Sequence, residues 1–332
     1  MNDENGSMRR VARLALALAS VVALGVLGPA PASAQVPARF YWKTLSGGSA
    51  VPLIFNSMSG NTNPFDPAYT VNAGANFEAT LAMAGYAHTF SLFDRAAMAA
   101  VILPMGRISG EATADGRSVG QPTSGFGDPT LEFNLNLLGP PAQKNLVDAL
   151  RYEPKFSLDL IADLALPIGE YDSDQPLNIG QNRWYGRVGV PIVWQLGSWV
   201  PGRRTTAEFL PAAWIFGDND DYVGQTLETD PIYQLDGHLT RDLNERLWAA
   251  LDGAWYRGGV ATIDGVEGEE LDNLGFGFTL GYQINENLGL TFGYKSTVGD
   301  SDPTDLRMDG FMVTLVSGWH PLVEGARRLH KE

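Results

Sequence analysis

The chain of 332 residues has no cysteine, few basic residues and, beyond its first 34 residues, no long apolar run. The absence of cysteine fits an oxidising compartment, although a protein without cysteine could reside anywhere. Its 23 basic residues face 38 acidic ones, and the formal net charge of −15 argues against nucleic acid as a partner. A membrane helix needs roughly 18 consecutive apolar residues, so the mature chain does not read as a helical membrane protein.

Motifs that would mark an enzyme are also missing. The sequence contains no HExxH, GxSxG, P-loop or GxGxxG pattern, and its four histidines, His88, His238, His320 and His330, lack metal-ligand spacing. Hydrolase, metalloprotease and nucleotide-binding functions therefore lack the residues that they require. We predict no enzymatic activity, no catalytic residues, no metal site and no cofactor.

Residues 1–34 have the three parts of a secretory signal peptide. A basic start precedes an apolar run over residues 14–27, which ends at the small-residue site Ala32-Ser33-Ala34. We expect the mature chain to begin near Gln35, after export from the cytoplasm. Removal of three basic and two acidic residues with this segment leaves a formal net charge of −16.

Alternation of apolar and polar residues is the strongest signal in the mature sequence. Between Phe156 and Leu166 every second residue is apolar, and the positions between them include Asp159 and Asp163. The same period of two recurs over residues 131–137, 274–282 and 288–294. Repeated strands of about ten residues, apolar outward and small or polar inward, are typical of a transmembrane β-barrel.

We predict an all-β fold, a transmembrane antiparallel up-and-down β-barrel of about 12 strands. Residues 35–319 would form the barrel as one domain, and residues 320–332 would form a periplasmic C-terminal tail. The candidate strands lie near residues 40–57, 77–90, 95–109, 126–138, 154–167, 183–197, 204–216, 231–242, 246–258, 272–284, 287–297 and 309–319.

The connections between these strands alternate in length. Short ones lie at residues 91–94, 198–203, 243–245 and 285–286, and long ones lie near 58–76, 110–125, 168–182, 217–230, 259–271 and 298–308. Short periplasmic turns and long extracellular loops are typical of the bacterial outer membrane, where we expect the protein to reside. The connection from Gly139 to Glu153 is long but falls on the short-turn side, and its residues 144–150 predict a small periplasmic helix.

Several segments carry a resemblance to a known family. They are GYAHTFSLFDRAAMAAVILP (85–104), SGFGDPTLEFNLNLLGPPA (124–142) and LPIGEYDSDQPLNIGQNRW (166–184), followed by residues 215–224, 230–243 and 248–259. These segments resemble the bacterial transporter family named for the meta-pathway of phenol degradation. The resemblance covers nearly the whole mature chain in order. It implies an outer-membrane barrel that admits hydrophobic or aromatic molecules, and it supplies no binding residues.

Polar side chains gather at the positions that the alternation places inside the barrel. They are Glu132, Asn134, Asn136, Asp159, Asp163, Arg183, Arg187, Gln234, Asp236, His238 and Asp252. One hypothesis is a lumen of mixed charge that sets the selectivity for a permeating solute. The other is that these groups pair across a narrow barrel and fill it. Inward glycines at positions 275, 277, 281, 289 and 293 favour open space.

Tryptophans lie where the predicted barrel would meet the lipid headgroups, and acidic residues gather in three of its long loops. Tryptophans within or at the ends of strands predict aromatic belts at the headgroup level: Trp184, Trp194, Trp214, Trp248, Trp255 and Trp319. A soluble β-sandwich would instead bury them in its core. Acidic loops around Asp218, Glu267 and Asp300 could bind calcium, but a solvated surface explains them more simply.

We therefore expect a monomeric outer-membrane channel for the passive uptake of small compounds, with aromatic or hydrophobic molecules as the leading class. About forty residues between the cleavage site and the second strand are too few for the plug domain of an active transporter. Its expected partners are outer-membrane lipid, lipopolysaccharide, the solute and the barrel assembly machinery, although the aromatic strand end at Trp319 is followed by further residues. The alternative is a non-conducting structural or adhesive barrel with a filled lumen.

Overall fold

The computed structural model describes residues 37–71, 75–114, 117–119, 122–298 and 306–324. The predicted signal peptide and most of the predicted C-terminal tail lie outside these residues. Among the described residues, no helix combines the length and the hydropathy that crossing a membrane requires.

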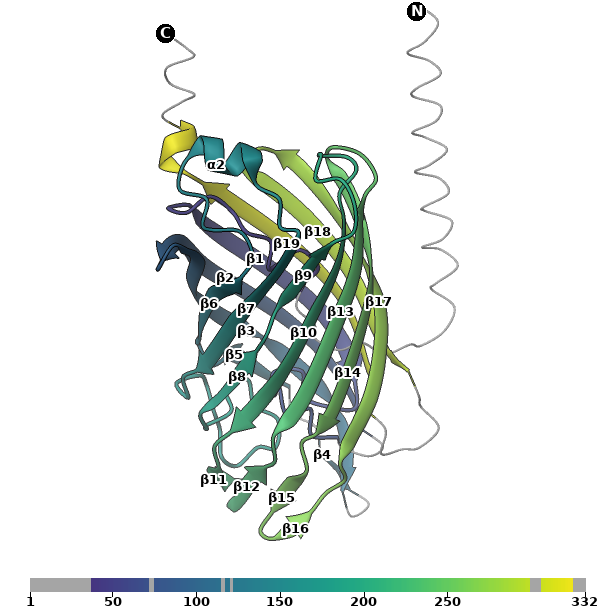
Figure 1. Ribbon diagram of the computed structural model, residues 1–332. Coiled ribbons are helices and arrows are strands. Elements are labelled where there is room, and N and C mark those ends of the chain that lie inside the picture. The colour runs from purple at the N-terminus through teal and green to yellow at the C-terminus, as the bar shows by residue number, and fades with distance from the viewer. Residues whose placement is uncertain (1–36, 72–74, 115–116, 120–121, 299–305, 325–332) are drawn as a thin grey trace, which may run out of the picture. The chain divides into compact units, whose positions relative to one another are not determined.

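Antiparallel strands at twelve wall positions of the described chain close into a barrel (Figure 1). Each strand pairs with the next, and the last pairs with the first from Ser49 opposite Trp319 to Gly60 opposite Met308. The predicted all-β barrel of about 12 strands is confirmed. The wall strands are β1 Ser49–Gly60, β2 Asn76–Leu92, β3 Arg95–Ala114, β6 Thr130–Leu138, β7 Phe156–Ala165, β8 Tyr185–Gly189 with β9 Ile192–Gln195, β10 Thr205–Phe216, β13 Ile232–Asp242, β14 Leu247–Gly258, β17 Leu271–Asn285, β18 Leu288–Val298 and β19 Met308–Trp319.

One wall position is divided between β8 and β9. Val190 and Pro191 separate the two strands, and proline has no N–H to donate to a neighbouring strand. Both strands nevertheless pair with the same neighbours, β7 and β10. They therefore act as one interrupted strand of the wall.

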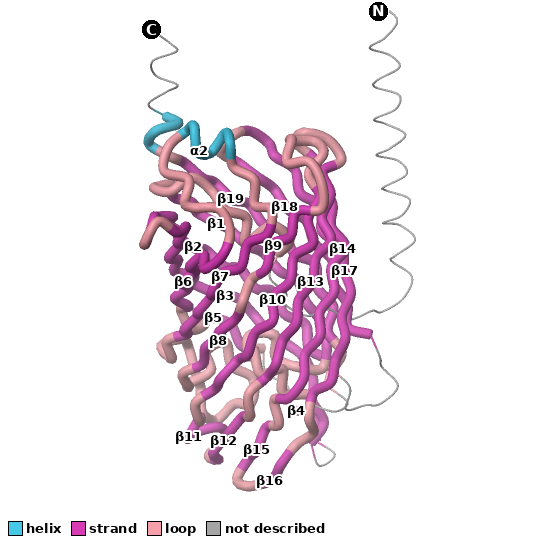
Figure 2. The backbone as a smooth tube through the Cα atoms, viewed as in Figure 1, coloured by secondary structure: helices cyan, strands magenta, loops and turns pink. Residues whose placement is uncertain are grey.

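The two ends of the barrel differ in the length of their connections (Figure 2). The short-turn end carries the tight β2–β3, β13–β14 and β17–β18 connections and the helix α2 (Leu146–Arg151), where the Asn145 side chain accepts from the Asp148 N–H at 3.0 Å. The small helix predicted for this segment is thus present. The long-loop end lies opposite.

Part of the long-loop end forms strands that the sequence did not predict. The strands β11 (Asn219–Tyr222), β12 (Gln225–Thr229), β15 (Ala261–Ile263) and β16 (Val266–Glu267) form a separate four-stranded sheet. Two further short strands, β4 (Arg117–Val119) and β5 (Thr123–Phe126), pair with β3. These segments were predicted as loops because such short pairings depend on contacts between distant hairpins, which local periodicity does not record.

The outer surface of the wall is apolar. Large side chains such as Leu53, Phe55, Phe209, Leu251 and Phe276 are exposed on alternate positions of their strands. An apolar surface spread over many strands is unfavourable in water and favourable in lipid. The buried side chains lie on the opposite face of the strands and point into the lumen.

Candidate functional site

The candidate site is the barrel lumen, because the polar residues predicted to face inward are all buried there. Each of the eleven residues is less than a tenth exposed, from 0% for Asp236 to 9% for Asp163. The alternation of the wall strands places them inside. Their part in permeation stays a prediction.

Residues 37–46, here called the N-terminal plug, enter the lumen at the short-turn end. The Arg39 backbone N–H donates to Glu208 Oε2 at 2.8 Å, and the Arg39 guanidinium lies 2.7 Å from Asp242 Oδ1. Trp42 Nε1 donates to Glu208 Oε1 at 2.8 Å, and the Lys43 ammonium pairs with Asp159. Three inward carboxylates therefore fix the plug to the wall.

This arrangement corrects the predicted first strand, which begins at Ser49 and not near residue 40. Arg39 has a φ of 67°, so the chain turns back instead of extending. Burial of Ala38 and Tyr41 stabilises the turn. The described residues ahead of β1 therefore include a segment that occupies the lumen.

Aromatic rings hold the same segment. The Trp42 ring lies 4.6 Å from the Trp199 ring, between centroids, and the Arg39 guanidinium carbon lies 4.2 Å above Trp42 and 4.5 Å above Trp248. Arg204 approaches Trp42 at 5.1 Å. Cation–π contacts of this kind strengthen when water is excluded, so they add to the ion pairs in fixing the plug.

The belt position predicted for Trp214 and Trp248 was wrong. Trp214 Nε1 donates to the buried Gln234 at 2.7 Å, and Trp248 stands over Gly281 on the inner wall. Both tryptophans lie at positions of the same parity as the inward residues of their strands, such as Asp252 on the strand of Trp248. The belt was predicted from their position near strand ends, without regard to this parity. Four tryptophans lie on the outward parity of their strands or at an exposed strand end: Trp184, Trp194, Trp255 and Trp319.

Gly281 allows Trp248 to lie against the wall, and Gly281→Ala should destabilise the barrel. A Cβ at this position would come within 2.0 Å of the Trp248 ring. We expect a loss of about 1–3 kcal/mol in the free energy of unfolding, the usual effect of overpacking, and a shift in tryptophan emission. Urea unfolding in detergent measures the first. Gly289→Ala is the matched control, since its Cβ would only touch the Gln283 amide at 3.5 Å; equal losses in both variants would contradict the explanation.

A second segment, residues 61–71 between β1 and β2, fills the lumen at the long-loop end and is here called the inserted loop. Asp66 lies 3.1 Å from Arg183 Nη2, and Arg183 Nη1 donates to Thr229 at 2.7 Å. Asn63 Nδ2 donates to the Asn178 carbonyl at 2.8 Å. Sequence reasoning had treated this segment as an ordinary external loop, because nothing in its local pattern shows that it folds inward.

Apolar side chains surround the inserted loop. This apolar cluster contains Met58, Phe65, Ala68, Tyr69, Ala75, Phe77, Ala79, Leu81, Ile108, Leu177, Ile179, Ile232, Ala254, Tyr256, Leu271, Leu306 and Met308. On β2 the pattern predicted for the wall is reversed, since Phe77, Ala79 and Leu81 are buried while Glu78 is exposed. The inner face is therefore apolar at the long-loop end, where small or polar inward residues were predicted.

Charged side chains in the middle of the lumen pair mostly along the wall. Arg187 Nε donates to Asp163 at 2.6 Å, and His238 Nδ1 lies 2.7 Å from Asp252 Oδ1. Both pairs join residues directly opposite each other on adjacent strands. Pairing along the wall differs from the predicted alternative, in which these groups would meet across the lumen.

Five buried charged residues are absent from the predicted set: Asp66, Asp128, Glu208, Asp242 and Lys295. Glu208 is 1% exposed and receives the plug, and Lys295 is 6% exposed beside the central charges. Both lie on the inward parity of their predicted strands, so extending the alternation to every strand would have found them. Among the described residues, no group of three or more histidine, aspartate or glutamate side chains is placed to hold a metal ion.

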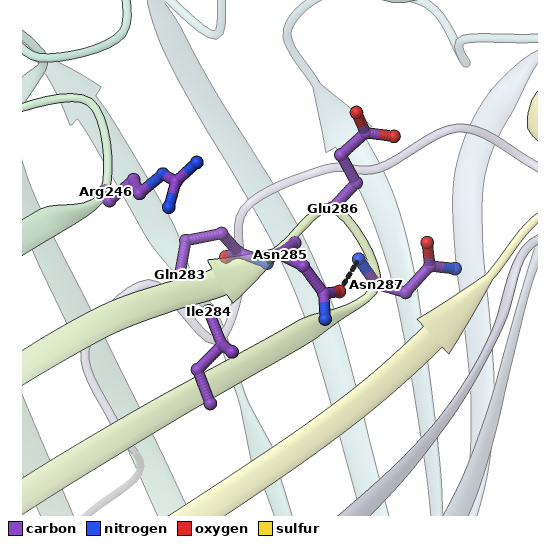
Figure 3. Close-up of a pocket in the computed structure, with 6 residues that line it drawn as sticks. All are labelled: Arg246, Gln283, Ile284, Asn285, Glu286 and Asn287. Atoms are coloured by element: carbon purple, nitrogen blue, oxygen red, sulfur yellow. Dashed lines mark hydrogen bonds between the residues drawn. The ribbon is translucent and has the colours of Figure 1, made fainter.

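A surface hollow lies on the β17–β18 turn at the short-turn end (Figure 3). Arg246, Gln283, Ile284, Asn285, Glu286 and Asn287 line it. The Asn287 N–H donates to Asn285 Oδ1 at 2.9 Å, which closes the turn. Since these are turn residues outside the lumen, the hollow adds nothing to the site.

A family model and one solved outer membrane channel match most of this chain. The model of a family described as "Putative MetA-pathway of phenol degradation" matches residues 59–315. An outer membrane channel from Pseudomonas putida F1 matches 86% of this chain and 100% of its own, at 20% sequence identity and a TM-score of 0.69. The β domain of the Bordetella autotransporter BrkA matches 82% of this chain and 100% of its own, at 9% identity and a TM-score of 0.47. The comparison with curated proteins found no match.

Proposed function

The chain belongs to the family of the MetA pathway of phenol degradation, and from that premise we propose that it is an outer-membrane channel for the passive uptake of small hydrophobic or aromatic compounds. Its fold is the one found in the P. putida outer membrane channel. The apolar cluster inside the lumen is the observation that supports this solute class. Phe77, Tyr69 and Tyr256 lie on the inner side of the barrel and offer aromatic surface to such a solute.

Partitioning into the apolar cluster would drive the first step of uptake, once the solute displaces the inserted loop that packs within the cluster. Moving apolar surface out of water is worth about 25 cal/mol per Å², which is enough to concentrate a single aromatic ring from a dilute solution. The polar middle of the lumen would then orient the polar group of the solute. Movement would follow the concentration gradient, since the N-terminal plug is a short segment and not a folded domain.

The predicted signal peptide and the apolar outer wall support an outer-membrane location, with lipid and lipopolysaccharide around the barrel and the assembly machinery as the inserting partner. Because the lumen lies within one closed barrel, a single chain would suffice as the transporting unit. Residues 320–332 would form the periplasmic tail.

A second candidate function is a structural or adhesive barrel that conducts nothing. The observation that favours it is that the N-terminal plug and the inserted loop both occupy the lumen, from opposite ends. Under this function both segments would be permanent core, and neither would move.

Single-channel recording of the refolded mature chain in a planar bilayer tests the proposed function. We expect discrete open steps, and we expect toluene, phenol or benzoate to interrupt them by occupying the lumen. Uptake of toluene into vesicles carrying the barrel should exceed uptake into vesicles without it. A folded barrel with no steps and no added uptake would favour the structural function instead.

A further inference from the structure

A second hollow, here called the α2 hollow, lies along the connection between β6 and β7 at the short-turn end of the barrel (Figures 1 and 2). Its volume is about 810 Å³, within the roughly 300–1,000 Å³ that sites for small ligands occupy. The connection, the β2–β3 turn and the start of β7 contribute to its lining, which includes Arg151, Tyr152, Lys155 and Phe156. The hollow is therefore large enough for a bound molecule.

The α2 hollow reaches the outer face of the barrel wall. Phe156 is exposed, whereas Ser157 and Asp159 on the same strand are buried, so Phe156 points outward. Trp194, which is also exposed, lies directly opposite Phe156 on β9. Since Phe156 both lines the hollow and belongs to the apolar outer wall, the hollow is continuous with the lipid-facing surface.

The helix α2 carries an unpartnered apolar face beside the hollow. Leu146, Val147 and Leu150 are all exposed, whereas Asp148 and Ala149 are half-buried. The three apolar residues share one side of the helix because of its period of 3.6 residues. An apolar helix face of this kind is unfavourable in water and favourable at the surface of a membrane.

Two cations at the hollow are free to bind an anion. Lys144 is already paired with Asp94, and Asp148 accepts from the Lys144 backbone N–H at 3.0 Å. Arg151 and Lys155 make no ion pair within the described part of the chain. Arginine and lysine side chains are the usual partners of phosphate oxygens.

A hydroxyl group at the hollow also lacks a partner. The Tyr152 phenol oxygen is buried and has no hydrogen-bond partner among the described residues, and its ring packs against the Trp199 ring at 6.4 Å between centroids. The Lys155 backbone is fixed nearby, since its N–H donates to Gln195 Oε1 at 3.0 Å and its carbonyl accepts from the Gln195 N–H at 2.7 Å. A buried hydroxyl without a partner is unfavourable, and a phosphate oxygen could accept from it.

The charges around the hollow fit a headgroup without net charge. Three carboxylates and three cations line it: Asp94, Asp148, Glu153, Lys144, Arg151 and Lys155. Glu153, like Arg151 and Lys155, makes no ion pair among the residues that the structure describes. A group with a phosphate for the two cations and an ammonium for Glu153 would satisfy all three.

We propose that the α2 hollow binds the headgroup of a phosphatidylethanolamine molecule in the periplasmic leaflet of the outer membrane. Arg151, Tyr152 and Lys155 would bind the phosphate, and Glu153 would accept from the ammonium group. The acyl chains would run along the outer wall beside Phe156 and Trp194. The hollow and the lipid-facing wall would then form one binding surface, which goes beyond the proposed uptake function and does not depend on it.

Native mass spectrometry of the refolded mature chain in detergent tests the proposal. The probes are dioleoylphosphatidylethanolamine, dioleoylphosphatidylglycerol, dioleoylglycerol, which has no phosphate, and glycerophosphoethanolamine, which has no acyl chains. We expect the first to bind at least about fivefold more tightly than each of the others, because each of them lacks one charged or apolar part of the contact. Equal binding of any of the other three would overturn the proposal.

Substitutions locate the binding site. Arg151→Gln with Lys155→Gln should weaken phosphatidylethanolamine binding at least about fivefold, and Tyr152→Phe, which keeps the ring, should weaken it less. Arg203→Gln with Arg246→Gln is the matched control, since it removes the same charge from exposed residues in other connections of the short-turn end. Unchanged binding in the folded Arg151 and Lys155 double variant, or an equal loss in the control, would overturn the proposal.

The same spectra identify a competing occupant. A second copy of the chain on this surface would appear as a dimer that the Arg151 and Lys155 double variant dissociates, with no preference among the lipids, and this result would overturn the proposal. Because lipid binding is measured without conduction, a barrel that fails to conduct would contradict only the proposed function.

Discussion

Deleting residues 37–46 from the mature chain should raise the single-channel conductance several-fold. These residues occupy the lumen at the short-turn end, where Glu208, Asp242 and Asp159 hold them by charged hydrogen bonds. Removing them opens the cross-section and leaves inward carboxylates without Arg39 and Lys43. We therefore expect the current to become more cation-selective as well, which the reversal potential in a potassium chloride gradient measures.

The control for this deletion keeps the plug and its charges. Arg39→Lys with Lys43→Arg preserves two cations in the segment and should leave conductance close to that of the parent chain. A deletion variant that folds but conducts no better than the parent would contradict the prediction. It would mean that the inserted loop, at the other end, limits passage by itself.

Arg183→Met should give the largest loss of stability among single substitutions of the lumen. Arg183 is 2% exposed, and its guanidinium lies 3.1 Å from Asp66, which is 6% exposed. Removing one partner of a buried ion pair leaves the other charge uncompensated, at a cost of about 3–5 kcal/mol. We expect the midpoint of urea unfolding in detergent to fall accordingly, and the inserted loop to become accessible to protease.

A double variant separates the charge from the contact. Arg183→Met together with Asp66→Asn removes both charges and should recover much of the lost stability, because an uncharged amide is less costly to bury than a lone carboxylate. Arg246→Met, at an exposed arginine of the short-turn end, is the matched control and should change little. If the double variant were as unstable as Arg183→Met alone, the uncompensated charge of Asp66 would not be the cause.

Most of the wall could be predicted because a barrel strand has a local pattern in the sequence. Alternation between an apolar outside and a polar inside located the strands and placed residues such as Asp163, Asp236 and Asp252 in the lumen. The same rule failed for β2, where Phe77 and Leu81 point inward and Glu78 is exposed. Parity reports which residues share a face, but it does not report whether that face meets lipid, water or another segment of the chain.

Residues outside the strands could not be placed in this way. The N-terminal plug and the inserted loop have no period, and their positions depend on partners such as Glu208, 169 residues after Arg39, and Arg183, 117 residues after Asp66. Trp214 and Trp248 were assigned to a belt on their position near strand ends, although their parity agrees with the lumen. Only the contacts with Gln234 and Gly281 identify their surroundings.

By itself, the sequence determined the barrel, its strands and the polarity of much of its inner face, because each depends on neighbours one or two residues apart. The tertiary structure alone decided how the lumen is filled: which segments enter it, which charges they meet and where apolar side chains line it. Those features depend on closure of the barrel, which brings β1 against β19 and sets residues more than a hundred positions apart beside one another. The lumen and the contacts within it form only when the barrel closes.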